Sequence, residues 1–225
     1  MKFPPRISML SALVFAITSC TSCNFLFPIR GNGNIVSETV LQGTSFNCVT
    51  STGIANVTLV QNISAPTSVV IVADSNLQQY LTATVSGGVL ALGVENGTSI
   101  SPSATIEITV SAPLFSRAES TGTGNLTGQG LDASTNLSIQ DMGTGNITFS
   151  GSTTDLTINS CGTGQIDTGG LTAANISLTL TGTGNCKVKA TGTISGTLTG
   201  TGNLSYNSGA TCQVSCSGTG RIYTY

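Results

Sequence analysis

The sequence predicts an all-β protein, a parallel β-helix-like solenoid of about six coils preceded by a β-rich N-terminal half. Three observations predict it. A Gly-Thr-Gly motif returns about every 20 residues in the second half of the 225-residue chain. Alternating apolar residues precede each copy, and no segment has the periodicity of an amphipathic helix. Hydrophobic residues make up 39% of the chain, which is enough for a core and argues against disorder.

The composition excludes several kinds of function. The chain has no His, so His-based triads, His metal sites and His pH switches are ruled out. It has no Trp and only 5% aromatic residues, which argues against aromatic platforms that stack sugars or bases. No Lys/Arg run is present, so we expect no nucleic-acid partner. We also expect no metal and no cofactor.

The N-terminus has the pattern of a targeting signal over residues 1–19. Lys2 and Arg6 precede the apolar run Met9–Ile17, which is too short to span a bilayer. The following Ile17-Thr18-Ser19-Cys20 resembles a bacterial lipobox, and this resemblance implies cleavage before Cys20 and lipidation of that residue. An ordinary signal peptide is the alternative. Without residues 1–19, five basic and nine acidic side chains leave a net charge of −4.

The lipoprotein resemblance also predicts a location. Since Thr21 rather than Asp follows Cys20, it implies sorting to the outer membrane of a bacterial envelope, on its surface or periplasmic face. The membrane would be a partner through the N-terminal lipid. Residues 20–33 then form a lipid-anchored tether that contains Pro28 and two glycines.

The next segment, 34–113, reads as the β-rich N-terminal half. A Gly87-Gly88 pair predicts a tight hairpin, and only Ser75–Tyr80 suggests a helical turn. β-branched runs predict strands at Asn56–Gln61, Ser68–Ala73, Leu81–Val85, Val89–Val94 and Thr105–Val110.

Residues 114–225 contain the repeats. The second glycines of successive motifs are 21, 19, 20, 18 and 18 residues apart, which indicates a β-solenoid with one coil per repeat. The glycines supply either a positive φ at a corner or space for the next coil. The repeat glycines are Gly122, Gly124, Gly143, Gly145, Gly162, Gly164, Gly182, Gly184, Gly200, Gly202, Gly218 and Gly220.

Three residues of each repeat should stack along the solenoid axis. The aliphatic residue after each motif should form a buried column: Leu126, Ile147, Ile166, Cys186, Leu204 and Ile222. Two polar columns should face solvent as ladders able to bind a ligand. One consists of Thr123, Thr144, Thr163, Thr183, Thr201 and Thr219, and the other of Asn125, Asn146, Asn185 and Asn203, interrupted by Gln165 and Arg221.

These features together resemble a known family. A lipoprotein-like start, Gly31-Asn32-Gly33-Asn34-Ile35 and serial Gly-Thr-Gly-Asn-aliphatic repeats are similar to the GIN domain, the head domain named for auto-transporter adhesins. The resemblance covers about residues 31–225. It implies a β-helix-like fold in a bacterial envelope protein and brings no catalytic residues. Thr replaces the usual Ser of the repeat, and the cysteines, Gln165 and Arg221 depart from the family pattern.

Six cysteines remain besides Cys20. An exported protein with an even number of cysteines invites disulfides, but no repeat Cys faces another in the adjoining coil. Cys212 and Cys216 lie about 13 Å apart on one strand, too far for a bond. We favour small buried thiols over disulfides for the six, which are Cys23, Cys48, Cys161, Cys186, Cys212 and Cys216.

Asp141 is the strongest catalytic candidate. Other repeats place Ser, Leu or Cys at its position, so its carboxylate either points inward or is solvated or bonded to the turn, and we favour the second alternative. A third hypothesis concerns Thr-x-Thr pairs such as Thr121/Thr123, which resemble the flat arrays of ice-binding solenoids. Met142 and Cys161 interrupt that array, and the glycines favour a corner.

We therefore expect a non-enzymatic, lipid-anchored envelope protein with an adhesin-like solenoid that binds a glycan or a protein. A structural lipoprotein without a ligand is the first alternative. A polysaccharide-active β-helix enzyme is the second.

Overall fold

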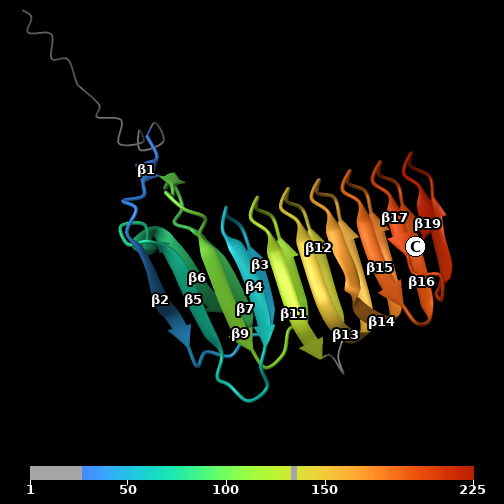
Figure 1. The fold of residues 1–225 in the computed structure, drawn as a ribbon, viewed down its shortest axis with the longest axis horizontal. Coiled ribbons are helices and arrows are strands. Elements are labelled where there is room, and N and C mark those ends of the chain that lie inside the picture. The colour runs from blue at the N-terminus through green and yellow to red at the C-terminus, as the bar shows by residue number, and fades with distance from the viewer. Residues whose placement is uncertain (1–26, 133–135) are drawn as a thin grey trace, which may run out of the picture.

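The computed structural model describes residues 27–132 and 136–225 and is a β-solenoid (Figure 1). In the described part of the chain, the strands are interrupted by only one helical element, the 3-10 turn η1 (Gln78–Tyr80), which lies inside the predicted segment. None of the described segments forms a helix long and apolar enough to cross a membrane.

Five of the N-terminal strands, β4, β5, β6, β7 and β9, agree closely with the predicted runs, and the other four, β1, β2, β3 and β8, were not predicted. Their bounds are β1 (Ile29–Arg30), β2 (Ile35–Gln42), β3 (Cys48–Ser51), β4 (Asn56–Gln61), β5 (Ser68–Asp74), β6 (Leu81–Ser86), β7 (Val89–Val94), β8 (Ile100–Ser101) and β9 (Glu107–Ala112). Those of the repeat half are β10 (Arg117–Ser120), β11 (Leu126–Asp132), β12 (Leu137–Asp141), β13 (Ile147–Ser160), β14 (Ile166–Leu180), β15 (Cys186–Ala190), β16 (Thr193–Leu198), β17 (Leu204–Tyr206), β18 (Thr211–Cys216) and β19 (Ile222–Thr224).

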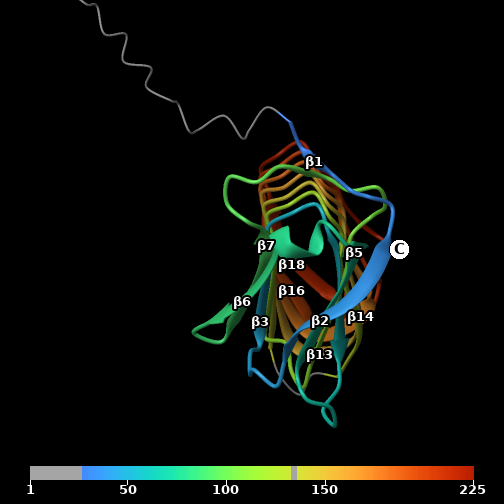
Figure 2. The ribbon, with the colours of Figure 1, turned by 90° about the vertical axis from the view of Figure 1, so that its left-hand side faces the viewer.

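Two stacks of parallel strands form the two faces of the solenoid (Figure 2). One runs β7-β3-β10-β12-β13-β14-β16-β18, and the other β9-β4-β11-β13-β14-β15-β17-β19. The long strands β13 and β14 belong to both faces, and β13 crosses between them at Gly151, whose φ is +123°. The six Gly-Thr-Gly turns bound five complete coils, where the sequence predicted about six.

The predicted apolar column is confirmed. Leu126, Ile147, Ile166, Cys186, Leu204 and Ile222 pair in register from coil to coil. The first five are at most 2% exposed. Because each coil buries this face only against its neighbours, the loss of one coil exposes the apolar residue of the next.

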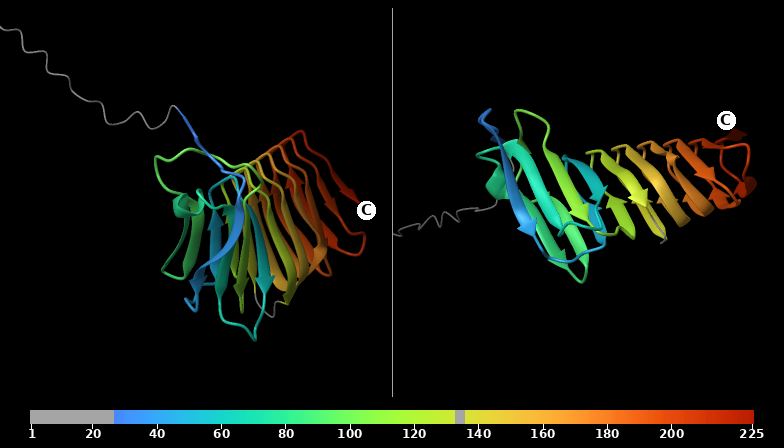
Figure 3. Two further views of the ribbon diagram at one scale, coloured as in Figure 1. Left: turned by 60° about the vertical axis from the view of Figure 1, so that its left-hand side comes forward. Right: turned by 60° about the horizontal axis from the view of Figure 1, so that its bottom comes forward.

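Antiparallel strands close the N-terminal end of the stack (Figure 3). β5 pairs antiparallel with β9, and β2 with β5. β6 and β7 form the predicted hairpin, with Gly87 and Gly88 at φ of 56° and 78°. These strands cover the first coil, so the sheet does not end there in an open parallel edge.

Candidate functional site

The Gly-Thr-Gly turns stack along one narrow edge of the molecule, seen at the top of Figure 2. No repeat glycine has a positive φ, so the structure selects the second explanation for these glycines, close approach of the next coil. A Cβ on Gly145 would collide with the carbonyl oxygen of Gly124, and one on Gly164 with that of Gly145. The glycines therefore set the spacing of the turns.

The threonine column lies on this edge with its side chains exposed. Each turn is held to the one before it through the backbone, as where the Thr144 N–H donates to the Gly122 carbonyl at 3.0 Å and the Thr163 N–H to that of Gly143 at 3.0 Å. All six threonines are exposed. The hydroxyl groups therefore project to solvent from a rigid backbone, at intervals of about 4.8 Å.

The asparagine column forms a hydrogen-bonded ladder beside it. The Oδ1 of Asn125 accepts from the Asn146 N–H at 2.9 Å, and that of Asn146 accepts from the Gln165 N–H at 3.0 Å. The ladder is interrupted at Gln165 and resumes at Asn185. The Asn203 N–H donates to Oδ1 of Asn185 and the Arg221 N–H to Oδ1 of Asn203, both at 2.9 Å. Each amide oxygen is thus used by the next coil, which leaves the Nδ2 groups of Asn125 and Asn146 for solvent or a ligand.

Sequence reasoning missed the first rung of this ladder. The Asn125 N–H donates to Oδ1 of Asn56 at 3.0 Å, and the Thr123 N–H donates to the Gly53 carbonyl at 2.9 Å. The turn Thr52-Gly53-Ile54-Ala55-Asn56 therefore stacks on the first motif although it lacks the second glycine. Its signal was an Asn followed by an aliphatic residue, Val57.

Asp141 lies in the interior. Asp141 is 0% exposed, so the expectation of a solvated carboxylate is wrong. The expectation of a bond to the turn is confirmed, because the Gly143 N–H donates to Oδ1 of Asp141 at 3.1 Å. Ser160 donates its hydroxyl to Oδ2 at 2.9 Å. Burial raises the pKa of this carboxyl, and the bonds from Ser160 and Gly143 oppose the shift. Both carboxylate oxygens are thus used by hydrogen bonds within the turn and to the next coil.

The cysteines correct another expectation. Cys186 is buried as expected, and burial raises the pKa of its thiol to about 12. Cys161 and Cys216 are exposed and Cys48 and Cys212 are half-buried, so the expectation of buried thiols is wrong for these four. All five are free, and Cys20 and Cys23 lie outside the described residues. In the described ranges no group of three metal-ligating His, Cys, Asp or Glu side chains occurs.

A buried carboxylate fastens the N-terminal segment to the solenoid. The Gly33 N–H donates to Oδ1 of Asp74 at 2.7 Å, and Ser103 donates its hydroxyl to Oδ1 at 2.5 Å and its N–H to Oδ2 at 2.9 Å. The hydrogen bond from the Ser103 hydroxyl lowers the pKa of Asp74. Burial opposes this shift, and the bonds from the N–H groups of Ser103 and Gly33 reinforce it. The Gly-Asn-Gly-Asn motif thus closes the capped end of the stack.

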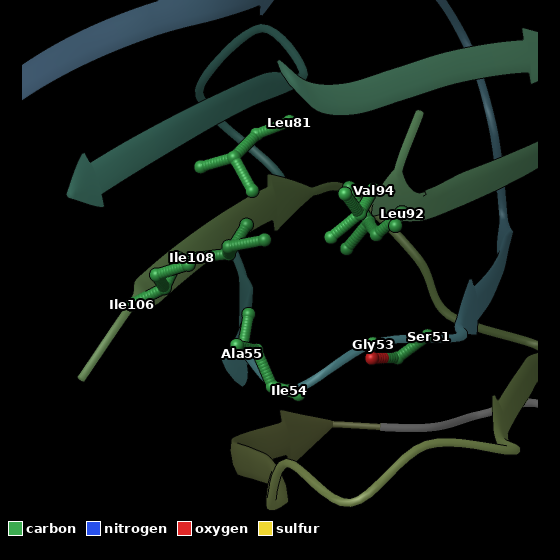
Figure 4. A pocket seen from close by; sticks show the side chains of 10 residues that line it. Ser51, Gly53, Ile54, Ala55, Leu81, Leu92, Val94, Ile106 and Ile108 are labelled. Carbon is green, nitrogen blue, oxygen red and sulfur yellow. The ribbon is translucent and has the colours of Figure 1, made fainter. Parts of the chain in front are cut away.

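An apolar cavity lies under this cap (Figure 4). Leu81, Leu92, Val94, Ile106 and Ile108 point into it. Its volume is about 10 Å³, roughly what one water molecule needs, and an apolar cavity of that size stays empty. It is therefore a packing defect rather than a ligand pocket.

Comparison with known proteins agrees with this architecture. A family model described as "Putative auto-transporter adhesin, head GIN domain" matches residues 45–210. No curated protein matches the chain. Among solved structures, a "putative adhesin" from Bacteroides fragilis is similar with a TM-score of 0.73 and 20% identity, over 88% of this chain and 100% of that one. A "putative lipid binding protein" from Parabacteroides distasonis gives 0.56 at 18% identity, over 88% and 100%. A "putative adhesin" from Parabacteroides merdae gives 0.54 at 18%, over 88% and 98%.

Proposed function

This chain belongs to the family of adhesin head GIN domains, and from that premise we propose that it is a lipid-anchored bacterial envelope protein whose solenoid attaches to a glycan or a protein. The anchor would be Cys20, and the attachment surface the edge that carries the threonine and asparagine ladders. We propose no catalytic activity, since the strongest catalytic candidate, Asp141, is buried and its carboxylate is bonded to Ser160 and Gly143.

The observation that carries this proposal is the rigid polar edge. Six exposed threonines and the neighbouring asparagines repeat at one fixed interval on turns that the glycines lock together. A preorganised row of hydroxyl and amide groups loses little entropy on binding, so it can form hydrogen bonds to a repeating ligand. Glycans and extended protein backbones both offer such repeating donors and acceptors.

A glycan and extracellular-matrix array tests the attachment. Changing Thr144, Thr163 and Thr183 together to Val removes three hydroxyls from the edge at nearly constant side-chain volume. The matched control changes Thr157, Thr179 and Thr197, which are exposed on a flat face. We expect the first variant alone to lose binding. Equal binding by all three proteins would reject this edge, and a protein that binds nothing on the array would favour the structural alternative.

Protease accessibility on intact cells tests the anchor and the location. We expect digestion of the wild-type protein on whole cells, and loss of membrane association in Cys20→Ala. Protection until the outer membrane is broken would place the protein in the periplasm and contradict attachment at the cell surface.

A further inference from the structure

The charged side chains are divided along the solenoid axis. All nine acidic residues of the chain lie at or before Asp167, where residues 27–167 contain only two cations, Arg30 and Arg117. The last 58 residues, 168–225, contain three cations and no acidic residue. The side chains therefore give one end of the stack a charge of +3 and the remainder −7, although the chain as a whole is mildly acidic.

The three cations lie near one end of the stack, two on a flat face and one beside the turn edge. Lys187 and Lys189 flank the buried Val188 on β15 and are exposed, because successive side chains of a strand point to opposite faces. Arg221 is exposed at the start of β19, where its N–H is fixed by Asn203. Lys187 pairs in register with Ser205, and Ser205 with Tyr223, so the patch spans three coils.

Tyr225 holds one of these cations in place. Its N–H donates to the Tyr206 carbonyl at 3.0 Å and its hydroxyl to the Val188 carbonyl at 3.2 Å. The ring lies beneath Lys187, whose Nζ is 4.7 Å from the ring centroid, a favourable cation–π contact. Asp167 is the acidic residue in register with Lys187, but in the described residues no ion pair neutralises any of the three cations.

We propose that Lys187, Lys189 and Arg221, here called the basic patch, bind the carboxylate or sulfate groups of an acidic polysaccharide. This deepens the proposed binding function, on which it rests, by naming the ligand class. Lys187 and Lys189, two residues apart on a strand, are about 7 Å apart, and the coil of Arg221 lies two strand spacings, about 10 Å, from theirs. Cations at such separations suit anions spaced along a linear polymer. The tyrosines are the only large hydrophobic side chains exposed among residues 168–225, so the patch has no aliphatic anchor for a lipid surface.

The rest of the molecule reinforces this selectivity. A polyanion is repelled by the seven excess negative charges on the other coils and attracted only at the basic patch. The ligand is therefore captured at the end opposite the N-terminal segment (Figure 1).

The experiment compares binding of the purified chain to immobilised dextran sulfate and to dextran, two polymers with the same backbone. The test variant is Lys187→Gln/Lys189→Gln/Arg221→Gln. A second variant adds Glu38→Gln, Glu95→Gln and Glu107→Gln, three exposed positions outside the patch, and so restores the wild-type net charge. Circular dichroism checks that both variants keep the fold.

We expect the wild type to bind dextran sulfate and not dextran, and both variants to bind it at least about tenfold more weakly. Recovery of binding in the charge-restored variant would overturn the inference, because net charge and not the patch would then control binding. Tighter binding to vesicles of anionic phospholipid than to dextran sulfate would also overturn it, in favour of a membrane. Failure of the wild type to bind dextran sulfate, together with binding of neutral glycans or proteins, would reject the patch yet leave the proposed function standing, whereas the absence of any binding would reject both.

Discussion

Ser160 donates a 2.9 Å hydrogen bond to the buried carboxylate of Asp141, one coil away. The two residues lie in one inward-facing column that also contains Ser51 and Ser120 and continues as Leu180 and Leu198. The hydroxyl of Ser120 has no hydrogen-bond partner. This column is thus polar from Ser51 to Ser160 and apolar at Leu180 and Leu198, while the rest of the core in these coils is apolar.

Asp141→Asn should raise the free energy of unfolding at pH 7. Burial raises the pKa of Asp141 above its ordinary value of 3.8, so the native state binds this proton more tightly than the unfolded chain does. As the pH rises from the pKa of Asp141 in the unfolded chain through its higher pKa in the folded protein, ionisation of this carboxyl lowers the free energy of unfolding. The amide of Asn does not ionise, so the variant lacks this loss.

Urea titration at pH 3.5 and pH 7 measures this effect. The gain of the variant over wild type should be larger at pH 7. Glu38→Gln, at an exposed site, should stay within about 0.5 kcal/mol of wild type at both values. A loss of stability in Asp141→Asn that is equal at the two pH values would mean that the hydrogen bonds matter more than the buried charge.

Asp74→Ala should release the N-terminal segment. The variant removes the acceptor for Gly33 and Ser103, so we expect faster hydrogen exchange in residues 29–34 and 99–103, with the repeats unchanged. Since the folded pKa is lowered, the wild-type contribution is present above pH 3.8 and disappears as the pH falls through the folded pKa. Unchanged exchange of these segments at pH 7 would show that β1 and β2 hold them without the carboxylate.

Gly145→Ala should destabilise the protein by about 3 kcal/mol. The added methyl group would overlap the Gly124 carbonyl oxygen, and the turns can separate only by stretching the hydrogen bonds between coils. Gly209→Ala is the matched control, because a Cβ there meets only the side chain of Asn207, at 3.6 Å. Thermal unfolding compares the two, and similar melting temperatures would refute the close-approach explanation.

The features of the fold that depend on residues close together in the chain could be predicted from the sequence, and those that depend on distant contacts could not. The period of the glycines and the alternation before them predicted the stack and the column from Leu126 to Ile222, because stacking repeats a local pattern. The pairing of β2 with β5 was not predicted, because its partners are 26 to 39 residues apart in the chain. The role of Asp74 was also missed, because it depends on Gly33 and Ser103 meeting in space. Exposure of Cys161 and Cys216 was also missed, since their residues lie where strand turns into corner and the alternation no longer decides which side faces solvent.

Thiol labelling at pH 8 checks this last point in a Cys20→Ala/Cys23→Ala background. Cys161 and Cys216 should react within the native protein, because both are exposed. Cys186 should react only after unfolding, since it is buried and its pKa is raised to about 12. Native-state labelling of Cys186 at the rate of the other two would contradict the packed interior.

The parallel stacking of the coils also has a mechanical consequence. The hydrogen bonds between coils run along the solenoid axis, so a pull between the N-terminal segment and the last coil passes through every interface in series. The force that the molecule withstands is then that of its weakest interface and not the sum over coils. The two interfaces of the three-residue strand β17, with β15 and with β19, contain three register pairs each, the fewest on their face. Under tension the stack should peel from its C-terminal end, one coil at a time, and each lost coil lengthens the chain before the capped end yields.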